Sequence, residues 1–180
     1  MAEETDLIRK ILAGDIESFR FIVKRYERPI VRMIRNIIYD ADCCEDIAQD
    51  VFFSAYSKLA SFDPALSSSS TWLFTIARNK SVNALKKKRM PSTSNLPERS
   101  IDGDLSEDTA KKELFGELDK RLHALPLRQR RALVLAEFEG LPYEQIAQIE
   151  GVRMGTIKSR INRAKEKLAK ALKKFVKDAI

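Results

Sequence analysis

Apolar side chains recur every three or four residues along most of the chain, which is the period that places them on one face of an α-helix. Residues 14–38 predict one helix, with Asp15 as its N-terminal cap and an interruption or restart near Pro29. Residues 40–62 predict a second helix. Its apolar residues step by four along one face and are Ile47, Val51, Ala55 and Leu59. Because no segment alternates like a strand, we expect an all-α protein.

A third helix is predicted at residues 72–86, after a serine-rich loop, and Ser70 or Thr71 can cap it. One half of this helix carries Leu73, Phe74, Ile76, Ala77, Ala84 and Leu85. The other half carries a polar stripe with the chain's only tryptophan, which consists of Trp72, Thr75, Asn79, Asn83 and Lys86. Such a stripe can stack on bases, read their edges and hold a phosphate backbone. A single tryptophan is also commonly a packed residue, so both interpretations stay open.

The composition changes after this helix. Residues 91–112 contain prolines, serines, a glycine and acidic residues with hardly any apolar repeat, which is typical of a linker. Helical spacing then continues to the end, with breaks that carry proline or glycine. We therefore expect two small helical domains, residues 1–90 and residues 113–180, joined by this flexible, acidic linker.

Residues 141–168 have the spacing of a helix-turn-helix. Ala147 is small where two helices cross closely, and Gly151 suits the turn between them. The second helix starts at Gly155 or Thr156, and its inward face is Ile157, Ile161, Ala164 and Leu168. Its opposite face carries Lys158, Ser159, Asn162, Arg163 and Glu166. Arg, Lys and Asn read base edges in the major groove, so the pattern predicts DNA binding, with a solvated helical hairpin as the alternative.

The charge balance favours an acidic partner for the second domain. The chain holds 33 Lys and Arg against 26 Asp and Glu, a net charge of +7. Residues 128–180 alone hold 13 basic and 6 acidic residues, which is typical of a nucleic-acid interface. A membrane surface is another possible acidic partner for the basic segment Lys165–Lys177. Phe175 and Val176 are too few to give this segment a strong apolar face.

No pattern typical of an enzyme is present, and we expect no cofactor and no metal. The only histidine, His123, lies in an ordinary helical repeat, without a phosphate loop, a nucleophile elbow or Cys/His spacing. Adjacent Cys43 and Cys44 predict two reduced thiols of a cytoplasmic protein, with oxidation or metal sensing as the alternative. The acidic start does not resemble a signal peptide, and no stretch approaches the roughly 20 apolar residues of a membrane span.

Residues 44–64, 70–89 and 124–168, in this order, are similar to the extracytoplasmic-function (ECF) sigma factors of bacterial RNA polymerase, in the sigma-70 family. The resemblance implies sigma region 2 in the first domain and sigma region 4 in the second. It also implies three partners: core RNA polymerase, promoter DNA and an anti-sigma factor. Pro142 departs from the family, which often has a capping serine there, but a proline is tolerated in the first turn.

The resemblance implies a role for each candidate surface. The surface for the β′ clamp helices of the polymerase is Asp46, Gln49, Asp50 and Phe53, and region 4 docks on the β flap. The −10 promoter element is contacted by Ser68, Ser69, Trp72, Thr75, Arg78, Asn79, Asn83 and Lys86. The −35 element is contacted by Arg153, Thr156, Lys158, Ser159, Arg160, Asn162 and Arg163. The loop at residues 63–70 holds a flipped base, whose identity its serine-rich sequence leaves open.

A helix-turn-helix regulator that acts without polymerase is the alternative function. Such a regulator would carry a sensor or receiver domain, with strands or a ligand pocket. The first domain instead predicts helices with an acidic face and an asparagine-bearing basic helix.

Overall fold

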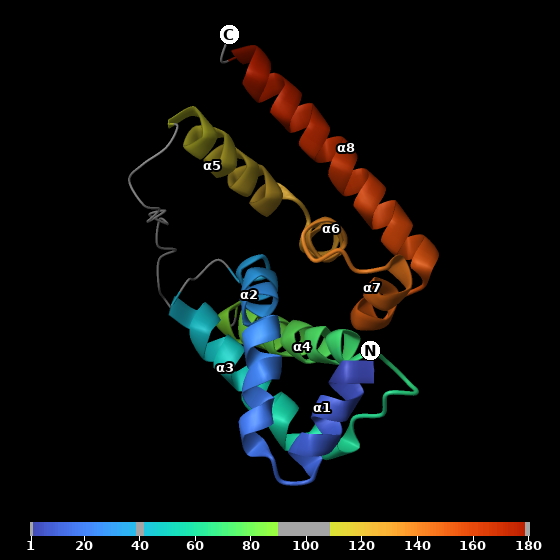
Figure 1. The fold of residues 1–180 in the computed structure, drawn as a ribbon. Helices are drawn as coiled ribbons and strands as arrows, with labels where there is room; N and C mark the ends of the chain where they lie inside the picture. Colours follow the sequence, from blue (N-terminus) through green and yellow to red (C-terminus); the bar gives the residue numbers. More distant parts are fainter. Residues whose placement is uncertain (1, 39–41, 90–108, 179–180) are drawn as a thin grey trace.

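The computed structural model describes residues 2–38, 42–89 and 109–178, and all regular elements in these ranges are helical (Figure 1). The all-α prediction is therefore confirmed. The first group of helices consists of α1 (Ala2–Leu12), α2 (Phe19–Arg35), α3 (Asp42–Ser57) and α4 (Ser69–Arg89), with the short 3₁₀ turns η1 (Ile16–Ser18) and η2 (Leu59–Ser61). The second group consists of α5 (Thr109–Ala124), α6 (Leu127–Glu137), α7 (Tyr143–Glu150) and α8 (Met154–Asp178).

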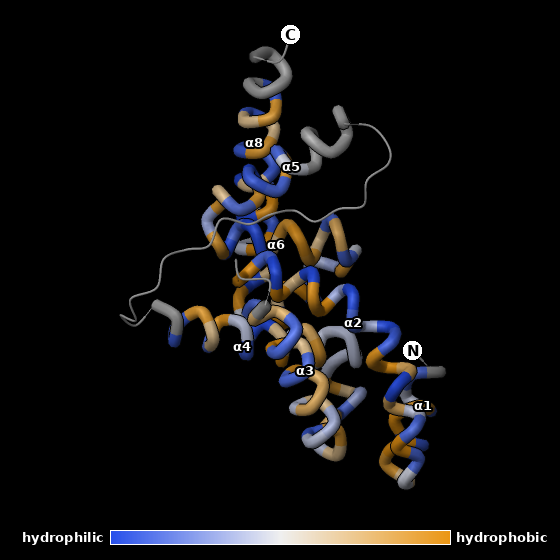
Figure 2. Tube along the Cα trace, turned by 90° about the vertical axis from the view of Figure 1, so that its left-hand side faces the viewer, coloured by the Kyte–Doolittle hydropathy of each residue, from blue (hydrophilic) through white to orange (hydrophobic). Residues whose placement is uncertain are grey.

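Helix α2 forms the centre of the first group and packs against both α3 and α4. Its buried residues Ile30, Met33 and Ile34 meet the predicted apolar face of α3, on which Val51 and Ala55 are fully buried. Burying a large aliphatic side chain stabilises the folded state by about 1.5–3 kcal/mol. The contact between α2 and α3 therefore contributes much of the stability of the first group. Orange and blue segments alternate along the helices in Figure 2, as this one-sided burial requires.

Pro29 lies inside an uninterrupted α2, so the predicted break or restart there is wrong. A proline inside a helix costs about 3 kcal/mol through a lost hydrogen bond and a steric clash. Tyr26 and Ile30 on either side are buried in the core, and this burial keeps the helix continuous.

The starts of α2 and α4 differ from their predicted positions. Asp15 does act as a cap, but of η1: its carboxylate accepts hydrogen bonds from the Ser18 backbone N–H (3.2 Å) and hydroxyl (2.6 Å). Helix α4 begins at Ser69, not Trp72, because the Ser68 hydroxyl accepts from the backbone N–H of Thr71 at 3.2 Å.

The second group contains the predicted helix-turn-helix. Gly151 ends α7 with φ 65° and ψ 40°, the left-handed conformation that glycine adopts without strain. The predicted inward residues Ile157, Ile161 and Ala164 of α8 are fully buried, together with Ile146 of α7. Within the described residues, no helix combines the length and the apolar character needed to cross a bilayer.

The predicted linker, residues 91–112, lies mostly outside the described residues. Helix α5 begins at Thr109, so helical structure resumes before the predicted boundary at residue 113. The two groups contact each other directly: α4 packs against α7, and α2 touches α6. In Figure 1, one end of α4 accordingly lies next to α7.

Candidate nucleic-acid interface

Helix α4 presents the predicted polar stripe. Its apolar residues Leu73, Phe74 and Ala77 are buried against α2 and α3, whereas Asn79 and Asn83 are exposed. Lys86, one turn further on, is also exposed, and Thr75 and Arg78 are half-buried at the edges of the stripe. The exposed amides and ammonium group point away from the core, as contact with bases and phosphates requires.

Asn79 is oriented by its neighbour. The Arg78 Nη1 donates a hydrogen bond to Asn79 Oδ1 at 2.9 Å, which leaves the amide N–H₂ of Asn79 to donate to a base. Thr75 is directed inward along the helix, since its hydroxyl donates to the Thr71 carbonyl at 2.7 Å.

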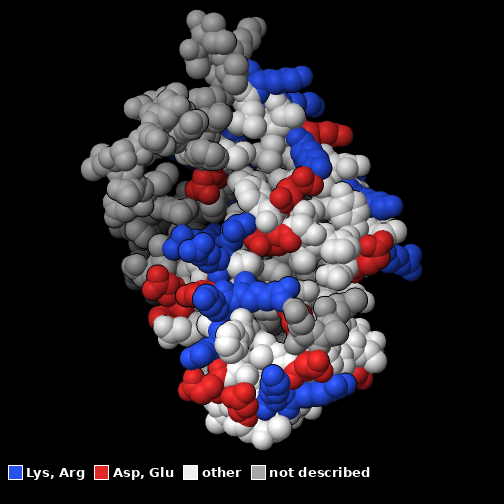
Figure 3. Space-filling model, in the orientation of Figure 1, with Lys and Arg blue, Asp and Glu red and all other residues white. Residues whose placement is uncertain are grey.

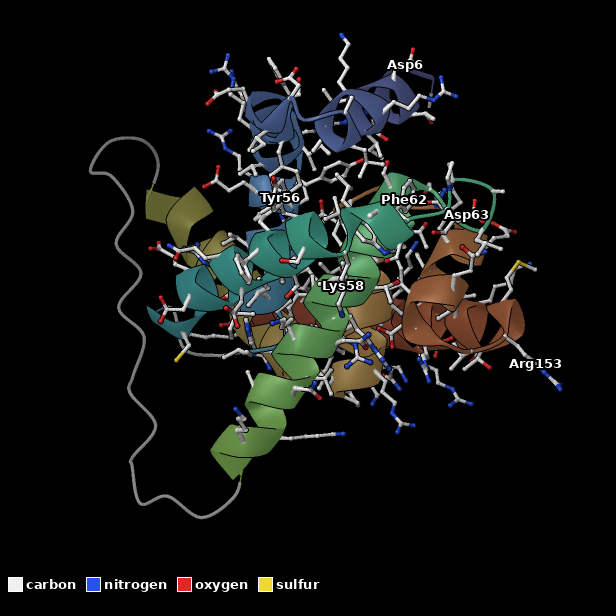
Figure 4. The ribbon with its side chains drawn as sticks, turned by 90° about the horizontal axis from the view of Figure 1, so that it is seen from below. Asp6, Tyr56, Lys58, Phe62, Asp63 and Arg153 are labelled. Carbon is white, nitrogen blue, oxygen red and sulfur yellow. The ribbon has the colours of Figure 1, made fainter. Side chains whose placement is uncertain are left out.

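Trp72 is half-buried and packs against Phe62, with ring centroids 5.2 Å apart and planes tilted by 49°. Figure 4 shows Phe62 and Asp63 beside the N-terminal end of α4. The tryptophan therefore braces the loop that precedes α4, and the packed interpretation of this residue is the one that its contacts favour.

The two serines predicted for the −10 element are both engaged. Ser68 caps α4 and shares hydrogen bonds with the hydroxyls of Ser70 (2.9 Å) and Thr71 (2.8 Å). Ser69 is buried and donates a hydrogen bond to Glu4 of α1. The start of α4 is thus tied to α1, for which the sequence predicted no site.

Helix α8 presents the predicted −35 face. Lys158, Ser159, Asn162 and Arg163 are exposed, and Thr156 is half-buried in the first turn. Basic side chains project along the edge formed by α8 in Figure 3. Arg153, just before the helix, extends outward from the body in Figure 4. The exposure of these side chains agrees with the helical spacing, although α8 begins at Met154, slightly earlier than expected.

Arg160 differs from the other residues of this set. Its side chain is only 14% exposed and its Nη1 lies 3.4 Å from the carboxylate of Glu150. Burial lowers the pKa of Arg160, as do the charges of Arg128, Arg131 and Arg78, and the charge of Glu150 opposes this effect. Arg160 therefore holds α8 to α7 in this structure and is not presented with the exposed −35 residues.

Glu150 also binds Arg131 of α6, which sequence reasoning missed. The Arg131 Nε and Nη2 donate to the two carboxylate oxygens at 2.8 and 2.5 Å, and the Glu150 side chain is 1% exposed. This bidentate pair fixes the helix-turn-helix against α6. The sequence did carry a signal for this pair, because Arg131 and Glu150 are charged residues at positions where the helical repeat predicts burial.

The predicted polymerase surface lies on α3. Asp46, Gln49, Asp50 and Phe53 are all exposed, and the Phe53 side chain is 72% exposed in spite of its size. Asp50 lies 3.5 Å from the ammonium of Lys80 on α4, an ion pair exposed to solvent. A protruding aromatic ring is typical of a protein interface, where aromatic residues are enriched.

Comparison with known sequences defines the family. Residues 22–90 match Sigma-70 region 2, and residues 115–168 match Sigma-70, region 4. The chain is 34% identical to the RNA polymerase sigma-H factor of Pseudomonas aeruginosa, covering 98% of this chain and 97% of that protein. It is also 34% identical to the ECF RNA polymerase sigma-E factor of Haemophilus influenzae, covering 92% and 95%. The chain belongs to the ECF sigma factors.

Solved structures share this fold. The sigma factor RpoE of Bartonella quintana, solved with the anti-sigma factor NepR, superposes with a TM-score of 0.68 at 28% identity, covering 87% of this chain and 98% of RpoE. CnrH, solved with the cytosolic domain of CnrY, shares the fold with a TM-score of 0.71 at 23% identity, covering 93% and 95%.

A polar clasp joins the two helix groups of this sigma factor. Arg32 of α2 donates to the Phe138 carbonyl at 3.2 Å and lies 3.4 Å from the Glu139 carboxylate, just after α6. Burial raises the pKa of Glu139, and the charge of Arg32 opposes this shift. The imidazole of His123 also lies 3.4 Å from the backbone carbonyl of Arg35. These contacts hold α5 and the segment after α6 against α2.

We call the state in which the two helix groups contact each other the closed arrangement. Removing the clasp should loosen it. In Arg32→Ala, the buried carboxylate of Glu139 loses its cation, so the second group should separate from α2 and the radius of gyration should rise in small-angle X-ray scattering. Arg20→Ala is the matched control, because Arg20 lies on the same helix and its ion pair with Glu17 and its contact with the Phe21 ring both stay within the first group. Equal radii for Arg32→Ala and the control would show that the clasp does not hold the two groups together.

Proposed function

We propose that this ECF sigma factor binds core RNA polymerase in the cytoplasm, recognises the −35 and −10 promoter elements and melts the DNA for transcription initiation. The observation that carries the proposal is the exposed Asn79, Asn83 and Lys86 stripe on α4, beside a serine-rich loop. Region 2 spans residues 1–90 in this proposal, a linker spans residues 91–112 and region 4 spans residues 113–180, with α5 starting at Thr109.

The exposed face of α8 supports recognition of the −35 element. Arg163 and Lys158 are suited to guanine, and Asn162 to adenine, in the major groove. Arg153 and Thr156 at the start of the helix are placed for phosphate contacts. We assign Arg160 to holding α8 in place for this recognition rather than to the DNA contact itself.

Promoter binding requires the closed arrangement to open. The two elements are named for positions about 25 base pairs apart, which corresponds to roughly 85 Å of duplex at 3.4 Å per base pair. Helix α4 packs directly against α7, the partner of α8 in the helix-turn-helix, so both elements cannot be contacted in this state. We infer that binding to the polymerase separates the two regions, with the acidic surface of α3 docking on the β′ clamp helices and region 4 on the β flap.

Melting follows from the chemistry of the α4 stripe. Taking a base out of the stack costs a few kcal/mol, and capture of the unpaired base by stacking and edge hydrogen bonds offsets that cost. Asn83, which is exposed and lies between Asn79 and Lys86 on the same face, is suited to hold such a base. The protein supplies binding energy alone, and no covalent step is required of it.

An anti-sigma factor is the third proposed partner. RpoE of Bartonella quintana, which resembles this chain over most of its length, was solved in complex with one. A groove of about 900 Å³ lies between α2, α3 and α5, lined in part by Arg28, Arg32 and Gln49. Because Gln49 belongs to the proposed polymerase surface, a partner in this groove would compete with polymerase.

The proposed melting role is tested with Asn83→Ala. With core polymerase and a promoter, the wild-type chain should make thymines of the −10 region reactive to permanganate, and Asn83→Ala should reduce this reactivity several-fold while closed-complex binding changes little. Asn162→Ala is the control, because it should weaken closed-complex binding at the −35 element instead. Normal melting by Asn83→Ala would remove its role, and no melting by the wild type would contradict the proposed function.

A further inference from the structure

The chain's only histidine lies at a contact between the two helix groups. His123 is on the last turn of α5, and its side chain is 8% exposed. Its Nδ1 lies 2.9 Å from the backbone carbonyl of Asp119 on the same helix, and its Nε2 lies 3.4 Å from the backbone carbonyl of Arg35 on α2. Both ring nitrogens therefore face an oxygen that can only accept a hydrogen bond.

A neutral imidazole cannot satisfy both of these oxygens. It carries a single N–H, so one ring nitrogen donates while the other directs its lone pair at a carbonyl oxygen. The Nδ1 contact is the shorter one, so the proton of a neutral ring lies there and the Nε2 lone pair faces α2. A protonated imidazole donates from both nitrogens. The hydrogen bond from α5 to α2 thus depends on the second proton.

The end of α2 also favours a cation at this position. Arg35 is the last residue of α2, and the C-terminal end of a helix carries a partial negative charge on its carbonyl groups. The Asp119 carboxylate lies 3.5 Å from Nδ1 and pairs with a protonated ring. The pair with Asp119 is made within α5, whereas the effect of the α2 terminus exists only while α5 lies against α2.

Other charged groups surround the imidazole. The Arg130 Nη1 donates to the His123 carbonyl at 2.8 Å, and Glu139 pairs with Arg32. The charged residues that line the same groove as His123 are Glu27, Arg28, Arg32 and Arg35 of α2, Glu45 of α3 and Asp119 of α5. These eight groups are four basic and four acidic residues, so their number favours neither form of the ring. The two carbonyl contacts are what distinguishes a protonated from a neutral imidazole.

We propose that His123 makes the contact between the two helix groups pH-sensitive, because its protonation adds a hydrogen bond from α5 to α2 and favours the closed arrangement. The charge of a histidine ordinarily changes between about pH 5 and 8. The closed arrangement binds this proton more tightly than the open one, so its stability rises as the pH falls and is lost as the ring is deprotonated.

The consequence for function rests on the proposed function, in which the two groups must separate on binding to core polymerase. At mildly acidic pH a smaller fraction of the chain is open. The apparent affinity for core polymerase falls by that fraction. Acidification would therefore hold this sigma factor away from the polymerase.

The test compares the Kd of the labelled full chain for core polymerase at about pH 6 and about pH 8, measured by fluorescence anisotropy. In His123→Gln, whose amide does not titrate, the ratio of the two Kd values reports all other titrating groups. Glu139, whose pKa burial raises, is one of them. The wild-type ratio should exceed the His123→Gln ratio by about fivefold, the effect of one hydrogen bond. Arg121→Gln is the matched control and should keep the wild-type ratio, because Arg121 pairs with Glu117 on the same helix.

A second measurement uses the wild-type chain alone. Because the chain has one histidine, the imidazole C–H resonances in an NMR spectrum follow this ring only. They should shift over the same pH range as the affinity, and small-angle X-ray scattering should show a compact chain at the lower pH.

Three results would overturn the proposal. They are equal Kd ratios for wild type and His123→Gln, imidazole resonances that do not titrate between the two pH values, and an extended chain at the lower pH. Thermal unfolding checks that His123→Gln folds. Failure of the wild-type chain to bind core polymerase at either pH would instead contradict the proposed function.

Discussion

Replacing Glu150 by alanine should lower the free energy of unfolding by about 3–5 kcal/mol, the cost of leaving a buried charge without its partner. The Glu150 side chain is 1% exposed, and Arg131, whose bidentate bond it accepts, is 6% exposed. Removal of the carboxylate leaves the buried Arg131 guanidinium without this partner. Thermal or urea unfolding of the purified variant measures the loss.

Two further variants make this prediction specific to the buried pair. Glu137→Ala removes a carboxylate from the same region, but its partner Lys165 lies at the surface at 2.8 Å, so a small effect is expected. The double variant Arg131→Met, Glu150→Leu should be markedly more stable than Glu150→Ala, because apolar residues of similar size often replace a buried pair at little cost. A loss for Glu150→Ala no larger than that for Glu137→Ala would contradict the structural role of the pair.

Replacing Phe53 by alanine should weaken binding to core polymerase by about 2 kcal/mol, or roughly 30-fold, as for an aromatic residue at the centre of an interface. Phe53 is 72% exposed between the acidic residues of α3, so its ring contributes little to the core. The unfolding transition of the variant should therefore stay close to that of the wild type. Fluorescence anisotropy of labelled chain titrated with core polymerase measures the affinity.

Phe21→Ala is the matched control for Phe53. Phe21 is also a half-exposed aromatic residue, but it lies on α2 beside α1 and outside the acidic surface. Its replacement should leave the affinity for polymerase unchanged. Equal affinities of Phe53→Ala and wild type would exclude Phe53 from the polymerase surface.

The helical repeat was sufficient to predict the orientation of α4 and α8. Burial of Leu73 and Ala77, opposite exposed Asn79 and Asn83, follows from a period of 3.6 residues alone. The start of α4 was less predictable, because Ser68, Ser70 and Thr71 can all cap a helix and only tertiary packing selects among them.

Helical periodicity does not predict contacts between residues that are far apart in the sequence. The spacing of apolar residues in α8 does not show that Glu150 of α7 lies next to Arg160. The sequence therefore predicts Arg160 among the exposed −35 residues. The link between Glu4 and Ser69, and the contact of Arg32 with Glu139, depend on how whole helices pack. Local periodicity gives the face of a helix, whereas the partner on that face is set by the fold.

Run-off transcription with core polymerase on a library of promoter fragments tests whether this chain acts as a sigma factor. We expect transcripts only when the chain is added, from a subset of fragments that share a −35 and a −10 sequence. We also expect weak binding of duplex promoter DNA by the chain alone. Tight, sequence-specific duplex binding by the chain alone, with no transcript on addition of core polymerase, would instead identify a regulator that acts without a sigma role.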